Sequence, residues 1–256
     1  MKISGRKIKG LLIDIDGTLF IKGEIPKKNL EILNRLNQKN IPYLLLSNTT
    51  SKSKADIIEK FSGSNIKLKE KSVFTALESI KTFLESKKGG AFLLLSEAAK
   101  KELSHISAQP VDYVVVGNAK KNMSYNNVNQ AFRYLTKGAK LISAAKTKYY
   151  QNSDGKLTLD GGAFTKALEF SSGKKAKIMG KPSKSFFNSA LKRLNLSADE
   201  VLMIGDDIKN DVLGAQKHGI LGILVKTGKY RKGDLKQVKS SPDLVLNDFS
   251  ELKNFL

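Results

Sequence analysis

Two carboxylates stand two residues apart at the end of a short apolar run. Residues 10–13 are apolar, Asp14 and Asp16 follow, and Gly17 comes next. In an extended chain, side chains two residues apart project to the same side, and a glycine lets the backbone turn sharply after them. We therefore expect both carboxylates to converge on one small volume. Such a pair can hold a hard cation, attack an electrophile or transfer a proton.

Two other interpretations of this stretch need to be considered. A calcium loop of the EF-hand type needs an acid or amide at its fifth position and a glutamate at its twelfth. Counted from Asp14, these positions hold Thr18 and Ile25, so the calcium loop is excluded. A plain polar turn is also rich in acids and glycine. The stretch alone therefore does not distinguish a reaction site from a polar turn, and the other segments of the chain must be considered.

The elements that would position the acids alternate between apolar runs and helical patterns. Residues 41–47, 201–204 and 220–225 are further short apolar runs, and helical spacing of leucines or phenylalanines fills the segments between. Continuous apolar strands are typical of parallel sheets that are covered on both faces. We predict an α/β fold with a doubly wound, Rossmann-like parallel sheet, in which ligands bind beyond the carboxyl ends of the strands.

Polar residues follow four predicted strands, and their types are complementary. The four sets are Asp14 and Asp16; Ser47 and Asn48; Lys181, after residues 176–180; and Asp206, Asp207 and Asp211. Acids, a cation and hydroxyl or amide groups at one sheet edge argue for a reaction site and against a plain turn.

A second βα series lies in the middle of the chain. Strands are predicted at residues 91–95, 113–116, 141–142 and 156–159, with a turn at Asp154 and Gly155 before the last, and a hinge at residues 87–90. We predict an inserted α/β domain over residues 79–178 within a core formed by residues 1–78 and 179–256. Helices are expected over residues 73–84 and 210–218, and over a segment after Gly161 and Gly162 that holds Phe164, Leu168 and Phe170.

The four sets resemble, in order and spacing, the motifs of the haloacid dehalogenase superfamily of aspartate-nucleophile phosphatases. These motifs are Asp-x-Asp-Gly-Thr, a serine or threonine closing the second strand, a lysine before proline, and Gly-Asp-x-x-x-x-Asp. The insertion between the second and third motifs resembles the C2-type cap of the subfamily that includes bacterial nucleotide phosphatases of the N-acetylglucosamine operon. The resemblance covers the whole chain.

The resemblance implies a role for each residue in the motifs. Asp14 would be the nucleophile that forms an aspartyl-phosphate, and Asp16 the general acid and then the general base. Mg²⁺ would be held by Asp14, Asp206 and the backbone carbonyl of Asp16. The remaining roles are phosphate binding by Ser47, Asn48 and Lys181, and support of the site by Thr18, Asp207 and Asp211.

The same resemblance implies a small phosphorylated substrate and a homodimer formed through the cap. A phosphotransferase or phosphomutase shares the aspartyl-phosphate and differs in the hydroxyl that attacks it, so it remains an alternative.

The composition of the chain narrows the classes of protein to which it can belong. The chain has 45 lysines and arginines against 24 acids, a net charge of +21, but the lysines are scattered over every segment and tryptophan is absent. A solvated lysine surface explains this better than a nucleic-acid site, although a non-catalytic polyanion-binding protein remains the alternative from another class. The absence of cysteine excludes disulfides and thiolate chemistry. We expect no membrane segment and a cytoplasmic location.

Overall fold

The computed structural model describes residues 1–151 and 156–256, so the predicted turn at Asp154 and Gly155 lies outside the described residues. Its contacts divide the chain into two compact units. The core unit comprises Met1–Ser47, Ile57–Phe74 and Lys181–Leu256. The insert unit comprises Asn48–Asp56 and Thr75–Gly180. The predicted domain limits at residues 78 and 178 stay a prediction.

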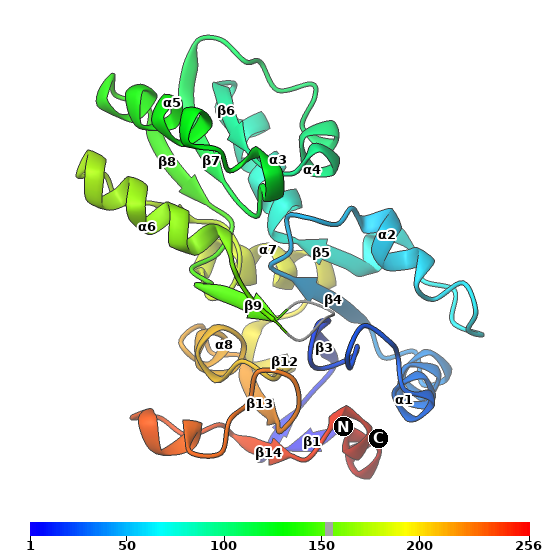
Figure 1. Ribbon diagram of the computed structural model, residues 1–256. Coiled ribbons are helices and arrows are strands. Elements are labelled where there is room, and N and C mark those ends of the chain that lie inside the picture. The colour runs from blue at the N-terminus through cyan, green and yellow to red at the C-terminus, as the bar shows by residue number, and fades with distance from the viewer. Residues whose placement is uncertain (152–155) are drawn as a thin grey trace. The chain divides into compact units, whose positions relative to one another are not determined.

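A six-stranded sheet in the order β14-β13-β12-β3-β4-β5 forms the centre of the core unit (Figure 1). β3 pairs in parallel with β12 and β4, β12 with β13, and β13 with β14. The strands are β3 (Gly10–Asp14), β4 (Tyr43–Ser47), β5 (Val73–Thr75), β12 (Val201–Gly205), β13 (Leu221–Val225) and β14 (Leu244–Leu246). The predicted α/β class with a parallel core sheet is confirmed.

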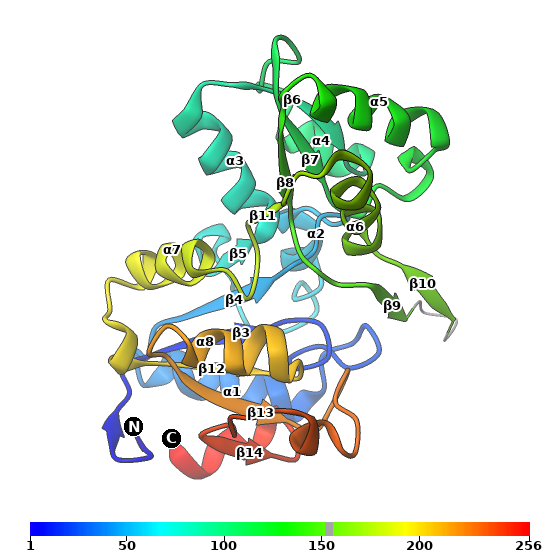
Figure 2. The same ribbon diagram turned by 90° about the vertical axis from the view of Figure 1, so that its left-hand side faces the viewer.

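The apolar run of β3 follows from its central place in this sheet. Leu11 and Ile13 belong to the apolar cluster on one face, whereas Leu12 belongs to the cluster on the other, and all three are fully buried. Helices on both faces supply the covering side chains, and Figure 2 shows α1 and α8 on opposite sides of β12. These helices are α1 (Lys27–Gln38), α2 (Lys54–Glu59), α7 (Lys184–Leu194) and α8 (Leu213–Gln216).

The insert unit has its own parallel sheet, in the order β11-β8-β7-β6. Apolar residues of α3 and α4 pack on one face, and those of α5 and α6 pack on the other. The strands are β6 (Gly90–Leu94), β7 (Val111–Val116), β8 (Lys140–Ser143) and β11 (Lys177–Ile178), and the helices are α3 (Ala76–Lys87), α4 (Glu97–Glu102), α5 (Tyr125–Thr136) and α6 (Gly161–Ser172). Two antiparallel ribbons complete the strands: β1 (Lys2–Ile3) with β2 (Arg6–Lys7), and β9 (Tyr149–Gln151) with β10 (Leu157–Leu159).

Several expectations about single elements were wrong. The helix expected over residues 73–84 begins only at Ala76, because Val73–Thr75 is strand β5. The helix expected over residues 210–218 is instead a π-helical turn, Ile208–Val212, followed by α8. The helix predicted to hold Phe164, Leu168 and Phe170 is present as α6, in which Leu168 is buried and Phe170 is 92% exposed.

The strand that precedes Lys181 also differs from its prediction. Residues 176–180 were expected to form a buried strand like that of Asp14, but only Lys177–Ile178 are extended, and β11 belongs to the sheet of the insert unit. Lys181 therefore does not follow a strand of the core sheet. No helix within the described residues is long and apolar enough to cross a bilayer.

Candidate active site

Asp14 is the last residue of the central strand β3, and its side chain is buried. Its Oδ1 atom accepts a hydrogen bond of 2.5 Å from Lys181 Nζ. Its Oδ2 atom is also buried, and among the described residues it has no hydrogen-bond partner. The carboxylate is thus held by one oxygen, and the other oxygen is left for a bound group.

Lys181 is a buried lysine that links two of the predicted acids. Besides Asp14, its ammonium lies 2.7 Å from Asp211 Oδ1, and only 2% of the residue is exposed. Burial opposes the charge on its ammonium, but Asp14 and Asp211 outweigh that effect and raise the pKa of Lys181. Lys181 is therefore a fixed positive charge in the interior of the core unit, not a solvated surface lysine.

Three buried carboxylates gather around this lysine. Asp14, Asp206 and Asp211 each offer an oxygen, and these oxygens lie within 4.8 Å of one another. Burial raises the pKa of Asp14 to about 6, with Lys181 acting in the opposite direction and Asp206 adding to the rise. Burial, and next the charge of Asp211, raise the pKa of Asp206 above its ordinary value, and burial does the same for Asp211. The cluster holds excess negative charge that a cation would relieve.

Asp207 shapes the backbone that places Asp211. Its Oδ1 accepts from the backbone N–H groups of Lys209 and Asn210, and its Oδ2 accepts from Asn210 Nδ2 at 2.7 Å. These bonds cap the π-helical turn, and Asp211 Oδ2 then accepts from the Asp207 N–H at 3.2 Å. Asp207 thus caps the turn, and Asp211 binds the lysine. Burial would raise the pKa of Asp207, but Lys229 and Asn210 hold it below its ordinary value.

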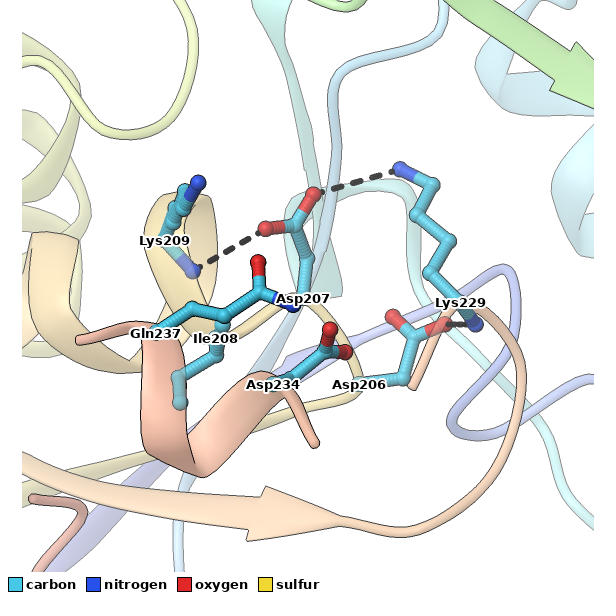
Figure 3. Close-up of a pocket in the computed structure, with 7 residues that line it drawn as sticks. All are labelled: Asp206, Asp207, Ile208, Lys209, Lys229, Asp234 and Gln237. Carbon is cyan, nitrogen blue, oxygen red and sulfur yellow. Dashed lines mark hydrogen bonds and ion pairs between the residues drawn. The ribbon is translucent and has the colours of Figure 1, made fainter. Parts of the chain in front are cut away.

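A pocket of about 200 Å³ opens beside these acids, within the core unit (Figure 3). Figure 3 shows the Asp207 carboxylate between the Lys209 N–H and the Lys229 ammonium, which lies 3.5 Å from Asp207 Oδ2. The residues that line the pocket are Asp206, Asp207, Ile208, Lys209, Lys229, Asp234 and Gln237.

The turn after β3 carries the next two predicted residues. The side chain of Asp16 is exposed, unlike that of Asp14, and Asp16 is not part of the buried acid cluster. Thr18 is fully buried, and its carbonyl accepts from Asn29 Nδ2 at 3.3 Å. Asn29 Nδ2 also donates to the Leu19 carbonyl, so α1 holds the turn in place. Asn29 is a supporting residue that the sequence analysis missed.

Of the three predicted phosphate ligands, Ser47 and Lys181 lie in the core unit and Asn48 lies in the insert unit. Ser47 ends β4 in the core unit, is buried, and directly follows Leu46, which pairs with Asp14. The Ser47 side chain is therefore at the same sheet edge as Asp14. Asn48 is the first residue of the insert unit. Its part in the site stays a prediction.

The donor set fits a hard divalent cation. Its ligand atoms are carboxylate oxygens, and they include the buried Asp14 Oδ2, which has no hydrogen-bond partner within residues 1–151 and 156–256. Oxygen-rich, partly filled sites of this kind are typical of Mg²⁺, which keeps several waters. Asp14 and Asp206 are the carboxylates predicted to hold it. Asp211 is already bound to Lys181 by its Oδ1 atom.

One segment that contacts the acids was given no role in the site from the sequence. Residues 227–229 follow β13, and the backbone N–H of Lys229 donates to Asp206 Oδ2 at 2.6 Å. Thr227 Oγ1 donates to the Gly17 carbonyl at 2.5 Å. The only sequence signal is a Thr-Gly-Lys stretch after an apolar strand, at the edge where the other motifs lie.

Comparison with known proteins identifies the family. A family model described as haloacid dehalogenase-like hydrolase matches residues 11–109, and a HAD-hydrolase-like model matches residues 178–252. Haloacid dehalogenase-like hydrolase domain-containing protein 2 of Mus musculus is 38% identical over 244 residues, which are 95% of this chain and 94% of that protein. The chain belongs to the haloacid dehalogenase-like hydrolases.

Other members of the haloacid dehalogenase-like hydrolases match over a similar length. The human phospholysine phosphohistidine inorganic pyrophosphate phosphatase is 32% identical over 255 residues, which are 97% of this chain and 94% of that protein. The crystal structure of 4-nitrophenylphosphatase from Thermotoga maritima is 26% identical, covers 96% of this chain and 97% of its own, and has a TM-score of 0.88. These findings confirm the predicted resemblance and the prediction of a phosphatase-type enzyme of this family.

Proposed function

We propose that this chain is a Mg²⁺-dependent phosphatase of small phosphorylated molecules that acts through an aspartyl-phosphate on Asp14. The observation that carries the proposal is the buried Asp14 carboxylate, held by Lys181 through one oxygen and set among other acids. Membership in a family with phosphatase relatives along the full chain supports the reaction class.

In the first step, an Asp14 oxygen attacks the phosphorus atom and the bond from phosphorus to the leaving oxygen breaks. Asp16 donates its proton to that oxygen, so the leaving group departs as a neutral alcohol. The exposed position of Asp16 suits this role, because a general acid must reach a group outside the buried cluster. Lys181 fixes the Asp14 carboxylate and keeps a positive charge beside it.

In the second step, water attacks the aspartyl-phosphate. Asp16, now ionised, takes the proton of the water, the bond from phosphorus to the Asp14 oxygen breaks, and phosphate leaves with the Asp14 carboxylate restored. Ser47 and the Asn48 amide are proposed to bind the phosphate oxygens during both steps. A bound Mg²⁺ would offset the negative charge that otherwise keeps a phosphate dianion away from Asp14.

The proposal is tested by phosphate release from a panel of phosphate esters, phosphoramidates and pyrophosphate, measured with Mg²⁺ and with EDTA. We expect release that requires Mg²⁺, and the order of the substrates would define the substrate class. Addition of glycerol as an acceptor distinguishes a hydrolase, which yields only phosphate, from a phosphotransferase, which also yields glycerol phosphate. Absence of release from every compound would contradict the proposal.

A further inference from the structure

The Asp206 carboxylate lies in a cradle that has no room for a side chain. Its Oδ2 atom accepts the Lys229 N–H, and two glycines from opposite ends of the chain, Gly17 and Gly228, flank it. A Cβ atom added to either glycine would overlap Oδ2 and lie 2.8 Å from Asp206 Cγ. Both glycines also have positive φ angles, +99° and +54°, which other residues adopt reluctantly.

A hydrogen bond links the two segments that flank Asp206, the turn at Gly17 and residues 227–228. Thr227 Oγ1 donates to the carbonyl of Gly17, and Cα of Gly17 lies 2.5 Å from the position that a Gly228 Cβ would take. The segment after β13 therefore contacts both the turn that follows Asp14 and the carboxylate of Asp206. The Oδ2 atom of Asp206 is fixed in this way, and this contact opposes rotation of the carboxylate about the Cβ–Cγ bond.

We propose that residues 227–229 form a positioning segment that fixes the orientation of Asp206 and so sets the affinity of the acid cluster for a divalent cation. The inference rests on the cation site of the proposed function. A cation ligand that is free to rotate must be ordered when the cation binds, whereas Asp206 is ordered beforehand by the Lys229 N–H. Loss of such outer partners lowers metal affinity by about 10- to 100-fold in other sites.

Two substitutions test the contacts that the segment 227–229 makes with Asp206 and Gly17. Gly228→Ala places a methyl group where Asp206 Oδ2 lies and must displace the carboxylate. Thr227→Val keeps the shape of the side chain but removes the hydroxyl that binds the Gly17 carbonyl. Gly233→Ala is the matched control, because Gly233 also has a positive φ angle, +108°, but an added Cβ atom would meet nothing within 4 Å.

The experiment measures the dissociation constants of Mg²⁺ and Mn²⁺ for the full chain by titration calorimetry at pH 8, without substrate. We expect binding to weaken by about 10- to 100-fold in Gly228→Ala, by a smaller factor in Thr227→Val, and to stay unchanged in Gly233→Ala. As a second measurement, the kcat of Thr227→Val should approach that of the wild type at saturating Mg²⁺, because only the occupancy of the site has changed. Circular dichroism verifies that each variant is folded.

The outcomes separate this inference from the proposed function. If the wild type binds neither cation, the cation site itself is refuted, and the inference with it. If the wild type binds and both Gly228→Ala and Thr227→Val bind equally well, the positioning role alone is refuted. If Gly228→Ala does not fold, the affinity of Thr227→Val decides, since threonine and valine have nearly the same shape. Equal weakening in Gly233→Ala would assign the effect to backbone strain and would also refute the inference.

Discussion

At the scale of single residues, the proposed reaction depends most directly on the side chain of Asp14. It is buried, one oxygen binds Lys181, and the proposed reaction needs its other oxygen as a nucleophile or cation ligand. In Asp14→Asn, the amide oxygen can still accept from Lys181, but the amide cannot form the aspartyl-phosphate. We expect phosphate release to fall by at least about 1,000-fold while the thermal unfolding temperature stays near that of the wild type. An active, folded variant would contradict the assigned nucleophile.

Lys181 is predicted to matter for stability as well as for chemistry. In Lys181→Met, the carboxylates of Asp14 and Asp211 lose a buried partner, and such losses cost about 3–5 kcal/mol. The cost should be smaller at pH 5 than at pH 8, because the acids can bind protons when their partner is absent. Urea unfolding at both pH values measures it. The exposed Lys209 provides the control, and Lys209→Met should change the free energy of unfolding by less than about 0.5 kcal/mol.

At the scale of elements, the π-helical turn Ile208–Val212 depends on its cap. Asp207 accepts from two backbone N–H groups of this turn, and the turn places Asp211 beside Lys181. Asp207→Ala should therefore lower the free energy of unfolding by about 1 kcal/mol, whereas Asp207→Ser, which keeps a capping oxygen, should lose less. Urea unfolding of both variants tests this. Equal losses in both would assign the effect to the charge of Asp207 and not to its cap.

The sequence predicted the elements whose signals are local and strong. β3 was found because all of its residues are buried and residues 10–13 form one apolar run before Asp14. β5 was missed because its short strand runs directly into α3, and Val73, Leu77, Ile80 and Leu84 together have a helical spacing. Thr75 was the available boundary signal, because its hydroxyl accepts from the Glu78 N–H and caps α3.

Sequence patterns reveal local signals and not contacts between distant segments, and this explains which residues around the site were missed. Asp14, Lys181, Asp206 and Asp211 could be selected from the sequence because their chemistry lies in their side chains, and the structure brings these side chains together. In the segment 227–229, the backbone N–H of Lys229 binds Asp206. Gly228 can lie close to the Asp206 carboxylate because it has no Cβ atom. Neither feature distinguishes these residues from an ordinary turn in the sequence. The sheet of β11 could not be predicted either, because strand order depends on contacts between distant segments.

At the scale of the whole molecule, the buried acids should link cation binding to pH. Burial raises the pKa of Asp14 to about 6, so the folded chain holds this proton more tightly than the unfolded chain. This contribution to stability is present at low pH and is lost as the pH rises through about 6. A cation that replaces the proton should therefore stabilise the protein more at pH 8 than at pH 5.

Thermal unfolding with and without Mg²⁺ measures this linkage. At pH 8 and a hundredfold excess over the dissociation constant, we expect the unfolding temperature to rise by about 5 °C or more, and at pH 5 by much less. Asp206→Asn should reduce the rise at pH 8, because it removes one proposed ligand. An equal rise at both pH values would indicate that the cation binds elsewhere, for example at exposed carboxylates.

The path of the chain between the two units determines when the site can form during synthesis. β3 pairs with β12, whose residues emerge from the ribosome long after those of β3, whereas the sheet of the insert unit is built from one continuous stretch of residues 75–180. Domains tend to fold as their segments emerge. All residues of the insert unit have therefore been synthesised before Lys181, Asp206 and the segment 227–229, which lie beside Asp14 in the folded core unit. A nascent or prematurely ended chain that lacks these residues has no acid cluster, so the complete site can form only after residue 229 has been added to the chain.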